Sequence, residues 1–404
     1  MATSFLYHLF GINQVQYVKT VFGGSTVLHA AIHPNAIKCP DCHSRRVIRF
    51  GQTPRTFKML PIGRKKIELA VSIPRICCHA CGAVKQIVLP FADPKKQYTR
   101  TLERYVIDLC RITTLGHVAK LTGLGWDTVK AIDKQHLGRL YKAANLKAAR
   151  YLAIDEIYLG KKRGFITLVM DLESGRVLHI GQGKGKEALM GFWRRLKRSK
   201  AKIKAVATDM ASGYMTAVLE HLPKADLVLD HFHLVKWFND KLATLRRQLY
   251  HQATQEEKAV LKGIRWLLLR AQENLKVHAH PKKDERLRLQ AALDINQTLA
   301  TAYYMKERLR LLFQAVDAQD AETELNAWIS EAEISGIKIL KDAARQLRRW
   351  RPFILNSYKH RISTGKLEAM NGRIKTLQRN AYGYRDEEYF NLCSTTIAFP
   401  VSVI

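Results

Sequence analysis

Hydrophobic and polar residues follow three patterns along the chain, and the first two cover roughly residues 1–147. Short β-branched runs broken by proline and glycine fill the first 90 residues and predict small strands and turns. From about Tyr98 to Lys147, apolar residues recur three and four apart, which predicts helices. Within this stretch, 114–137 contains two helical segments joined by a glycine-containing turn, as in a helix-turn-helix. A plain helical hairpin has the same periodicity, so the pattern alone leaves both interpretations open.

The third pattern begins near residue 150 and predicts a mixed sheet followed by long helices. Strand-like runs occupy 150–160, 164–171 and 176–181, and a helix, a strand, a helix and a strand then follow. This order of elements is typical of a mixed α/β sheet. The stretch from about 236 to 350 is poor in glycine and proline, which predicts helices without strands, with a loop at 278–286 between two of them.

The charge of the chain is strongly positive, with 67 Lys and Arg against 35 Asp and Glu and a formal net charge of +32. We expect a nucleic acid as partner, because each phosphate that Lys or Arg neutralises releases condensed counterions. A ribosome-associated or merely basic protein is the alternative. The sequence contains neither an apolar run of 18 residues nor a signal-peptide pattern at its start. We therefore expect a cytoplasmic protein without a membrane partner.

Four of the seven cysteines form two Cys-x-x-Cys pairs, "CPDC" and "CHAC", on either side of residues 43–77. Two such pairs supply the closed tetrahedral shell of a structural zinc ion. The predicted ligands are Cys39, Cys42, Cys78 and Cys81. His43 and His79 could replace a thiolate, and the adjacent Cys77 leaves the register open; four unligated thiols are the alternative. Cys110 and Cys393 lie in apolar contexts typical of core residues.

The predicted helix-turn-helix would place its second helix, which begins near Trp126 or Asp127, in the major groove of DNA. Its periodicity divides the side chains between an inner and an outer face. The residues expected inside are Val118, Leu121, Val129 and Ile132. The residues expected to face DNA are Trp126, Asp127, Thr128, Lys130 and Lys134.

Two acids end apolar strands in this otherwise basic chain: Asp155 in "YLAID" and Asp209 in "AVATD". Strand ends converge on one edge of a mixed sheet, so these carboxylates can share a divalent metal ion. Glu368, with Asn371 one helical turn on, is the best candidate for a third acid, although a lone Glu in a basic helix is usually a surface ion pair.

Three stretches together carry a resemblance to a known family: "AIDEIYLGKKRGFITLVMDLESGRVL", "ATDMASGYMTAVLEHLPKADLVLDHFHLVKWFND" and "KLEAMNGRIKTLQRNAYGYRDEEYF". They resemble DDE transposases of bacterial insertion sequences, specifically the IS-L-three group. The resemblance implies an α/β multidomain chain with a zinc ribbon, a helix-turn-helix and an RNase H-like core interrupted by helices. The expected domains are 1–95 (zinc ribbon), 96–148 (helix-turn-helix), 149–235 (core, first part), 236–350 (helical insertion) and 351–404 (core, last part, and C-terminus).

Carried over by position, the resemblance implies that Asp155, Asp209 and Glu368 are the catalytic acids and bind magnesium or manganese. The expected accessory residues are Glu156, Asp230, His233 and Asn371. Asp230 and His233, in "DHFH", have the spacing of an Asp–His pair that recurs after the second acid in related transposases, and would position DNA or the scissile phosphate; a His packed at a strand end is the alternative. Further DNA contacts are expected from Arg194, Arg195, Arg373, Lys375 and Arg379.

The activity implied by the resemblance is cleavage at the terminal inverted repeats of the element and transfer of the strands to target DNA. The partners would be double-stranded DNA and a second copy of the chain on the paired ends, in a bacterial cytoplasm. A serine or tyrosine recombinase is disfavoured because no Arg and His pattern surrounds a candidate nucleophile. A structure-selective nuclease on the same fold and a DNA-binding regulator derived from a transposase remain as alternatives.

Overall fold

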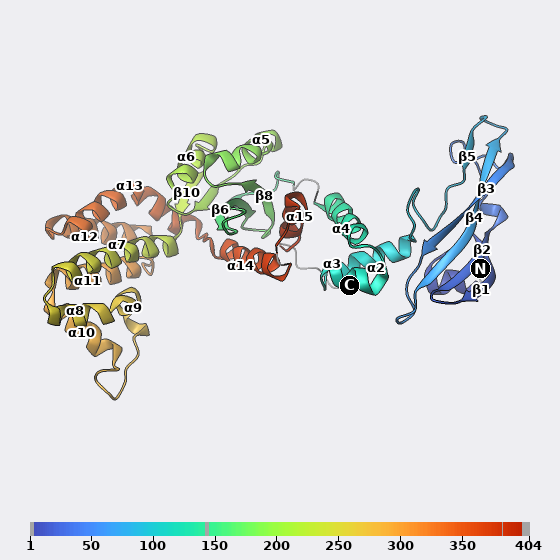
Figure 1. Ribbon diagram of the computed structural model, residues 1–404. Coiled ribbons are helices and arrows are strands. Elements are labelled where there is room, and N and C mark those ends of the chain that lie inside the picture. Colours follow the sequence, from blue (N-terminus) through green and yellow to red (C-terminus); the bar gives the residue numbers. More distant parts are fainter. Residues whose placement is uncertain (1–3, 142–144, 382, 398–404) are drawn as a thin grey trace. The chain divides into compact units, whose positions relative to one another are not determined.

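A computed structural model describes residues 4–141, 145–381 and 383–397, which divide into two compact units (Figure 1). The N-terminal unit comprises Met1–Lys142 with Gln378–Cys393, and the second unit comprises Ala143–Leu377 with Ser394–Ile404. The predicted last part of the core, 351–404, is therefore divided between the two units, and its residues 398–404 lie outside the described part of the chain.

A five-stranded sheet forms the first part of the N-terminal unit, with strand order β1-β2-β4-β3 and β5 paired to β4. Only the β2–β4 pair is parallel. The strands are β1 (Val15–Phe22), β2 (Thr26–Ile32), β3 (Val47–Lys58), β4 (Ile67–Cys78) and β5 (Val84–Gln86), and two short helices, α1 (Phe5–Phe10) and η1 (Pro34–Ala36), accompany them. The sequence predicted small strands, but β3 and β4 have 12 residues each and form one long hairpin.

Three helices follow in this unit: α2 (Arg100–Cys110), α3 (Leu115–Thr122) and α4 (Trp126–Leu140). Gly123 adopts a left-handed conformation, φ 67°, and ends α3, as expected for a glycine just past a helix. Val118, Val129 and Ile132 are buried as predicted. Leu121 was expected inside, but this prediction is wrong: it is 58% exposed, and Leu124 from the turn packs into the core in its place.

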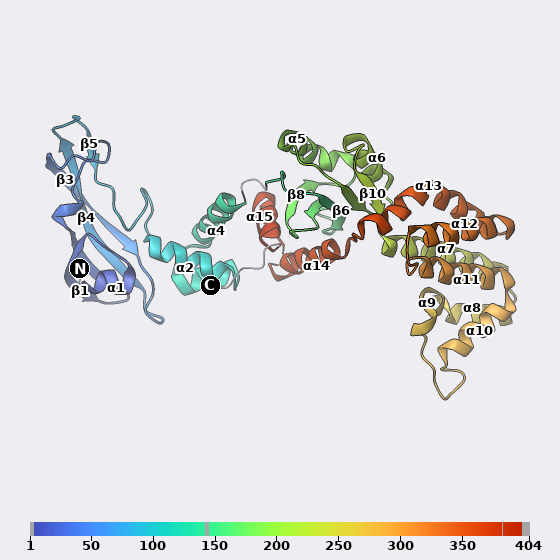
Figure 2. The same cartoon turned by 180° about the vertical axis from the view of Figure 1, so that it is seen from behind.

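A mixed five-stranded sheet with order β10-β9-β6-β7-β8 forms the centre of the second unit. β6 pairs in parallel with β9, and β9 with β10, whereas β6, β7 and β8 are antiparallel. The strands are β6 (Tyr151–Tyr158), β7 (Phe165–Asp171), β8 (Val177–Gln182), β9 (Ala205–Thr208) and β10 (Asp226–Leu229). The helices that connect them are η2 (Lys186–Leu189), α5 (Met190–Ser199) and α6 (Ser212–His221), and both views show α5 and α6 on the side of the sheet opposite α14 (Gly365–Asn380) (Figure 2).

Helices occupy the whole stretch between β10 and α14, and no strand occurs among its described residues. The sequence predicted a helical insertion over 236–350, and the helical stretch of the structure runs from the start of α7 to the end of α13. Its members are α7 (His231–Gln252), α8 (Gln255–Gly263), α9 (Arg265–Leu269), η3 (Gln272–Asn274), α10 (Glu285–Ile295), α11 (Gln297–Leu312), α12 (Ala318–Ile334) and α13 (Lys338–His360). Their buried residues share one hydrophobic core with the sheet, so the insertion is packed onto the core. The last helix, α15 (Glu387–Ile397), begins in the N-terminal unit.

Candidate active site and cysteine cluster

Asp155 and Asp209 lie side by side because their strands are parallel neighbours. Ile154 of β6 pairs with Thr208, the last residue of β9, so the next residues along the chain are the two acids: Asp155 within β6 and Asp209 just after β9. Asp155 is only 8% exposed and Asp209 is half-buried. Burial raises the pKa of both carboxyl groups, and the charge of Asp155 raises that of Asp209 further. The strand register thus concentrates negative charge where solvent stabilises it poorly.

Helix α14 brings Glu368 and Asn371 to the same region. Asn371 Nδ2 donates a hydrogen bond of 2.6 Å to Asp155 Oδ2. Glu368 lies three residues earlier, and therefore on the same face of the helix. Its Oε1 is 3.5 Å from His233 Nε2, in the first turn of α7. The structure therefore collects Asp155, Glu368, His233 and Asn371 from β6, α14 and α7.

Glu156 belongs to the other face of the sheet. Successive strand residues point to opposite faces, and the Tyr214 hydroxyl of α6 donates to Glu156 Oε2 at 3.3 Å. Tyr214 also contacts the hydroxyl of Thr167 at 2.8 Å. These contacts tie Glu156 to the packing of α6 and away from the neighbouring Asp155.

Asp230 joins the starts of two helices. Its Oδ1 accepts from the backbone N–H of Phe232 in α7, at 2.8 Å, and its Oδ2 from that of Thr364, just before α14, at 2.7 Å. Burial alone would raise the pKa of Asp230, but these donors hold it below its ordinary value. Asp230, 3% exposed, thereby fixes the start of the helix that carries Glu368, a role that its spacing in the sequence did not predict.

The two neighbouring aspartates carry negative charge that the described part of the protein does not neutralise with Lys or Arg. In a chain of net charge +32, neither Asp155 nor Asp209 forms an ion pair with Lys or Arg among the described residues. Two adjacent, poorly solvated carboxylates without a cationic partner are costly unless a bound ion compensates them. Asp155, Asp209 and Glu368 offer the oxygen ligands that magnesium and manganese prefer.

The four predicted cysteines meet at one end of the β3–β4 hairpin, where Val47 pairs with Cys78. Cys39 Sγ is 3.6 Å from Cys81 Sγ, and Cys42 Sγ is 3.5 Å from Cys78 Sγ. Zinc–sulfur bonds of 2.3 Å in a tetrahedron place sulfur atoms about 3.8 Å apart, so this cluster could bind zinc. His43 and His79 are not part of the four-residue group. The long hairpin explains how ligands so far apart in sequence converge.

The electrostatics of the cluster also favour a cation. The backbone N–H of Cys42 is the main reason why the pKa of Cys39 falls to about 7. Cys81 accepts from the N–H of Ala83, which lowers its pKa, but the neighbouring Cys42 and Cys39 thiols outweigh this and raise it to about 12. Ionisation of one thiol therefore opposes ionisation of the next. A bound divalent ion would offset the repulsion between the thiolates.

Helix α4 exposes only part of the predicted set, and Thr128 is half-buried. Trp126 is 49% exposed and Asp127 is exposed, but Lys130 and Lys134 both bond to Asp386, at 2.9 and 3.0 Å. Lys134 also pairs with Glu388 at 2.7 Å, and the hydroxyl of Tyr389 donates to the buried Asp133. The free face of α4 carries Ala131, Gln135 and Arg139, which sequence reasoning missed. The three consecutive acids 386–388, unusual in a basic chain, were the signal that could have revealed this contact.

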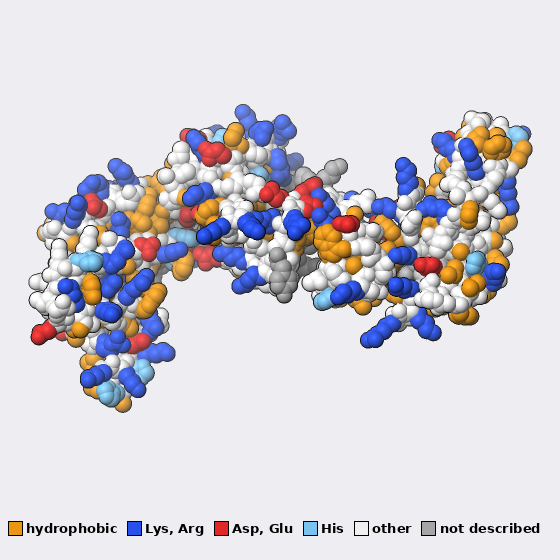
Figure 3. All heavy atoms as spheres, viewed as in Figure 1, with side chains coloured by type: hydrophobic (Ala, Val, Ile, Leu, Met, Phe, Trp, Pro, Cys, Tyr) orange, Lys and Arg blue, Asp and Glu red, His pale blue; other side chains and the backbone are white. Residues whose placement is uncertain are grey.

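The other basic residues predicted to contact DNA lie on two helices. Arg194 and Arg195 are on α5, and Arg195 Nη1 donates to the carbonyl of Leu178 at 3.0 Å. Arg373, Lys375 and Arg379 are exposed on α14, the helix of Glu368. Lys and Arg side chains are spread widely over the visible face of the molecule (Figure 3). Their contacts with DNA stay a prediction.

Comparisons with known proteins agree with this arrangement. Residues 152–394 match the model of the DDE domain of ISL3 elements, described as "Transposase", and residues 88–137 match the "Helix-turn-helix domain of transposase family ISL3". The chain is thus a transposase with a DNA-binding helix-turn-helix. More narrowly, it belongs to the ISL3 family of insertion-sequence transposases, which confirms the resemblance seen in the sequence.

Two curated relatives span nearly the same length. The transposase for insertion sequence element IS1001 of Bordetella parapertussis is 31% identical over 97% of this chain and 95% of that protein. The transposase for IS1557 of Mycobacterium tuberculosis is 27% identical over 93% of this chain and 90% of that protein. Among solved structures, the Drosophila P element transposase strand transfer complex matches 75% of this chain and 92% of that chain, with a TM-score of 0.39 and 10% identity. No described helix is long and apolar enough to span a membrane.

Proposed function

We propose that this transposase cuts DNA at the terminal inverted repeats of its insertion sequence and joins the freed strands to target DNA, through an RNase H-like core. The observation that carries this proposal is the placement of Asp155 in β6 next to Asp209 just after β9, with α14, the helix of Glu368, joined to Asp155 through Asn371. Among the described residues, these three carboxylates have no Lys or Arg partner, and the chain belongs to a family of DDE transposases; both facts support a metal-dependent phosphodiester reaction.

The proposed catalytic acids would hold magnesium or manganese. When bound, such ions supply the charge that activates a water or a DNA hydroxyl and stabilises the leaving oxygen. Asp155 is held from both sides, because its Oδ1 accepts from the N–H of Glu156 and its Oδ2 from Asn371. His233 is placed to orient Glu368, and Asp230 fixes the helix on which Glu368 lies.

The N-terminal unit would supply recognition of the element's ends. We propose that the helix-turn-helix reads duplex DNA through α4, beginning at Trp126, Asp127 and Thr128, and that a structural zinc ion on the four cysteines stabilises the β3–β4 hairpin beside it. Lys130 and Lys134 can join this surface once they leave Asp386. A homodimer on paired ends follows from the reaction itself.

The test separates chemistry from binding. Asp155→Asn and Glu368→Gln are expected to abolish cleavage and strand transfer of DNA that carries the element's ends, while binding to the same DNA persists. Glu156→Gln is the matched control, because it changes an adjacent acid that faces Tyr214, and it should retain cleavage. Equal loss of end binding in Asp155→Asn would mean that the acids are structural, and retained cleavage in Glu368→Gln would refute the assigned site.

A further inference from the structure

Two of the six tryptophans are exposed, and only one of them belongs to the helix-turn-helix. Trp126 on α4 is 49% exposed and Trp266 on α9 is 65% exposed, whereas the other four pack within the second unit. A cation lies over each exposed ring: Lys130 Nζ is 5.6 Å from the centroid of Trp126, and Arg265 Cζ is 4.8 Å from that of Trp266. An exposed tryptophan with a stacked cation therefore occurs on the insertion as well as on the DNA-reading helix.

The stretch of chain around Trp266 is rich in positive charge, and the next exposed large hydrophobic residues along the chain are Val277 and Leu287. From residue 251 to residue 275, all of which are described, Trp266 is the single large hydrophobic side chain that is exposed. Lys262 and Arg265 are exposed and form no ion pair with a carboxylate among the described residues. Burial lowers the pKa of Arg246 on α7, and the charge of Arg265 lowers it further, so like charges gather here. Lys and Arg are also frequent where α8, α9 and α10 lie, at the lower left of the space-filling view (Figure 3).

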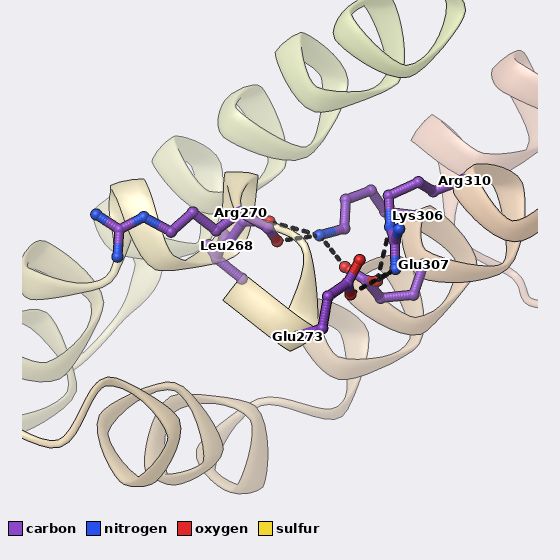
Figure 4. Close-up of polar contacts among 6 residues, drawn as sticks. All are labelled: Leu268, Arg270, Glu273, Lys306, Glu307 and Arg310. Carbon is purple, nitrogen blue, oxygen red and sulfur yellow. Dashed lines mark hydrogen bonds and ion pairs between the residues drawn. The ribbon is translucent and has the colours of Figure 1, made fainter. Parts of the chain in front are cut away.

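A buried lysine anchors the helix that carries Trp266 (Figure 4). Lys306 of α11 is 2% exposed, and its Nζ donates to the carbonyls of Leu268 and Arg270, at 3.1 and 2.7 Å, at the end of α9. Glu307 forms an ion pair with this ammonium group. At the preceding turn, Arg288 of α10 donates to the carbonyl of Gly263 at 2.9 Å. Trp266 thus lies on a short helix whose two ends are both fixed, while its own side chain faces solvent.

We propose that Trp266 is a stacking platform for an unpaired base of DNA, with Arg265 and Lys262 beside the adjoining phosphates. An isolated aromatic ring among cations fits single-stranded nucleic acid, because bases stack on aromatic rings while basic side chains hold the backbone. A contact between two protein surfaces would instead require several apolar neighbours. The inference rests on the proposed function, since cleavage and joining at DNA ends produce unpaired or frayed strands.

The experiment compares two labelled DNAs that bind the full-length chain, measured by fluorescence anisotropy. One is a duplex with a single-stranded 3′ thymidine tail, and the other is the same duplex with blunt ends. Trp266→Ala should weaken binding of the tailed duplex by about 5- to 100-fold and leave binding of the blunt duplex unchanged. Trp266→Phe should retain most of the affinity, and Leu287→Ala, an exposed apolar residue on α10, is the matched control.

Each other outcome has a distinct meaning. Equal losses for tailed and blunt DNA, or no loss for either, would overturn the stacking role. A loss accompanied by conversion of a dimer to monomers in sedimentation would also overturn it and would place Trp266 between copies of the chain. If the wild-type chain bound neither DNA, the proposed function itself would fail; if blunt-duplex binding and cleavage persisted in Trp266→Ala without a tail effect, only the stacking role would fail.

Discussion

Asp386 neutralises two lysines on the helix expected to read DNA, and its removal should strengthen DNA binding. Asp386→Asn keeps the side-chain oxygen that accepts from the N–H of Tyr389 at the start of α15, because asparagine is an equally good N-cap. The change removes only the charge that faces Lys130 and Lys134. A change in DNA affinity can therefore be assigned to the loss of the ion pairs and not to altered packing of α15.

The expected gain follows from the exposure of the pairs. The side chains of Lys130, Lys134 and Asp386 are 24%, 30% and 23% exposed, so each pair should contribute near the upper end of the range for surface pairs, about 1 kcal/mol. The wild-type lysines must break these pairs to reach DNA phosphates, whereas the variant lysines need not. Asp386→Asn should thus bind end DNA about 5- to 30-fold more tightly, or about 1–2 kcal/mol in total.

The effect should not change between about pH 5 and pH 8. Hydrogen bonding to the N–H of Tyr389 and to Lys130 holds the pKa of Asp386 well below its ordinary value. A carboxyl group with a lowered pKa contributes its stabilisation above the unfolded-state value of about 3.9 and loses it only as the pH falls through the folded-state value. The charge that competes with DNA is therefore present throughout that window.

Anisotropy titrations of end DNA at fixed salt measure the change. Asp108→Asn is the matched control, because it makes the same charge change at a 69% exposed site of α2 in the same unit. The reasoning would be refuted if Asp108→Asn gave an equal gain, or if Asp386→Asn still gained affinity in a chain that already carries Lys130→Gln and Lys134→Gln.

Three further predictions concern the cysteines, the buried lysine and Asp230. Cys39→Ser should lower the zinc content measured by atomic absorption and weaken end binding, with Cys110→Ser as the control that retains zinc; unchanged zinc in Cys39→Ser would contradict the assignment. Lys306→Met should lower the free energy of unfolding by about 1–3 kcal/mol, because it removes the donor shared by the carbonyls of Leu268 and Arg270 and one of the two cations that pair with the buried Glu307, while Arg310 remains. Lys306→Met with Glu307→Leu should recover part of that loss in urea unfolding followed by tryptophan fluorescence; no recovery would contradict a paired-charge origin. Asp230→Asn should reduce cleavage more than end binding and should lower the free energy of unfolding by about 1–3 kcal/mol. The reason is that an amide side chain has one oxygen and cannot accept from the N–H groups of both Phe232 and Thr364, as the carboxylate does. Intact cleavage would show that the start of α14 does not depend on Asp230.

Local patterns predicted the elements of this fold better than they predicted the contacts between them. The apolar runs "YLAID" and "AVATD" predicted that Asp155 and Asp209 lie beside each other, and the parallel pairing of β6 with β9 does bring them together. Asp155 was expected to end its strand, but β6 continues to Tyr158, so only Asp209 follows a strand end. Glu368 has no such local signature, and its candidacy depended on resemblance. Its neighbour Asn371 bonds to Asp155, 216 residues away, and no periodicity encodes a partner at that distance.

The helix-turn-helix shows the same limit. Periodicity placed Val118, Val129 and Ile132 in the core but could not distinguish Leu121 from Leu124, because the turn, and not the helix, fills the last position. Periodicity also predicted that Lys130 and Lys134 face away from the core formed by α2, α3 and α4, and with respect to these three helices that prediction is correct. The acids that cover them arrive from a segment about 250 residues later.

The position of α15 has a genetic consequence. A stop codon or frameshift shortly after Asn380 would leave all three proposed catalytic acids in the chain but delete the helix that covers Asp133 and Lys134. Such a truncated gene would be scored as intact by a search for its three acids, yet its product would have an incomplete DNA-reading unit. For this chain, the final coding stretch is a better indicator of a functional copy than the presence of the acids.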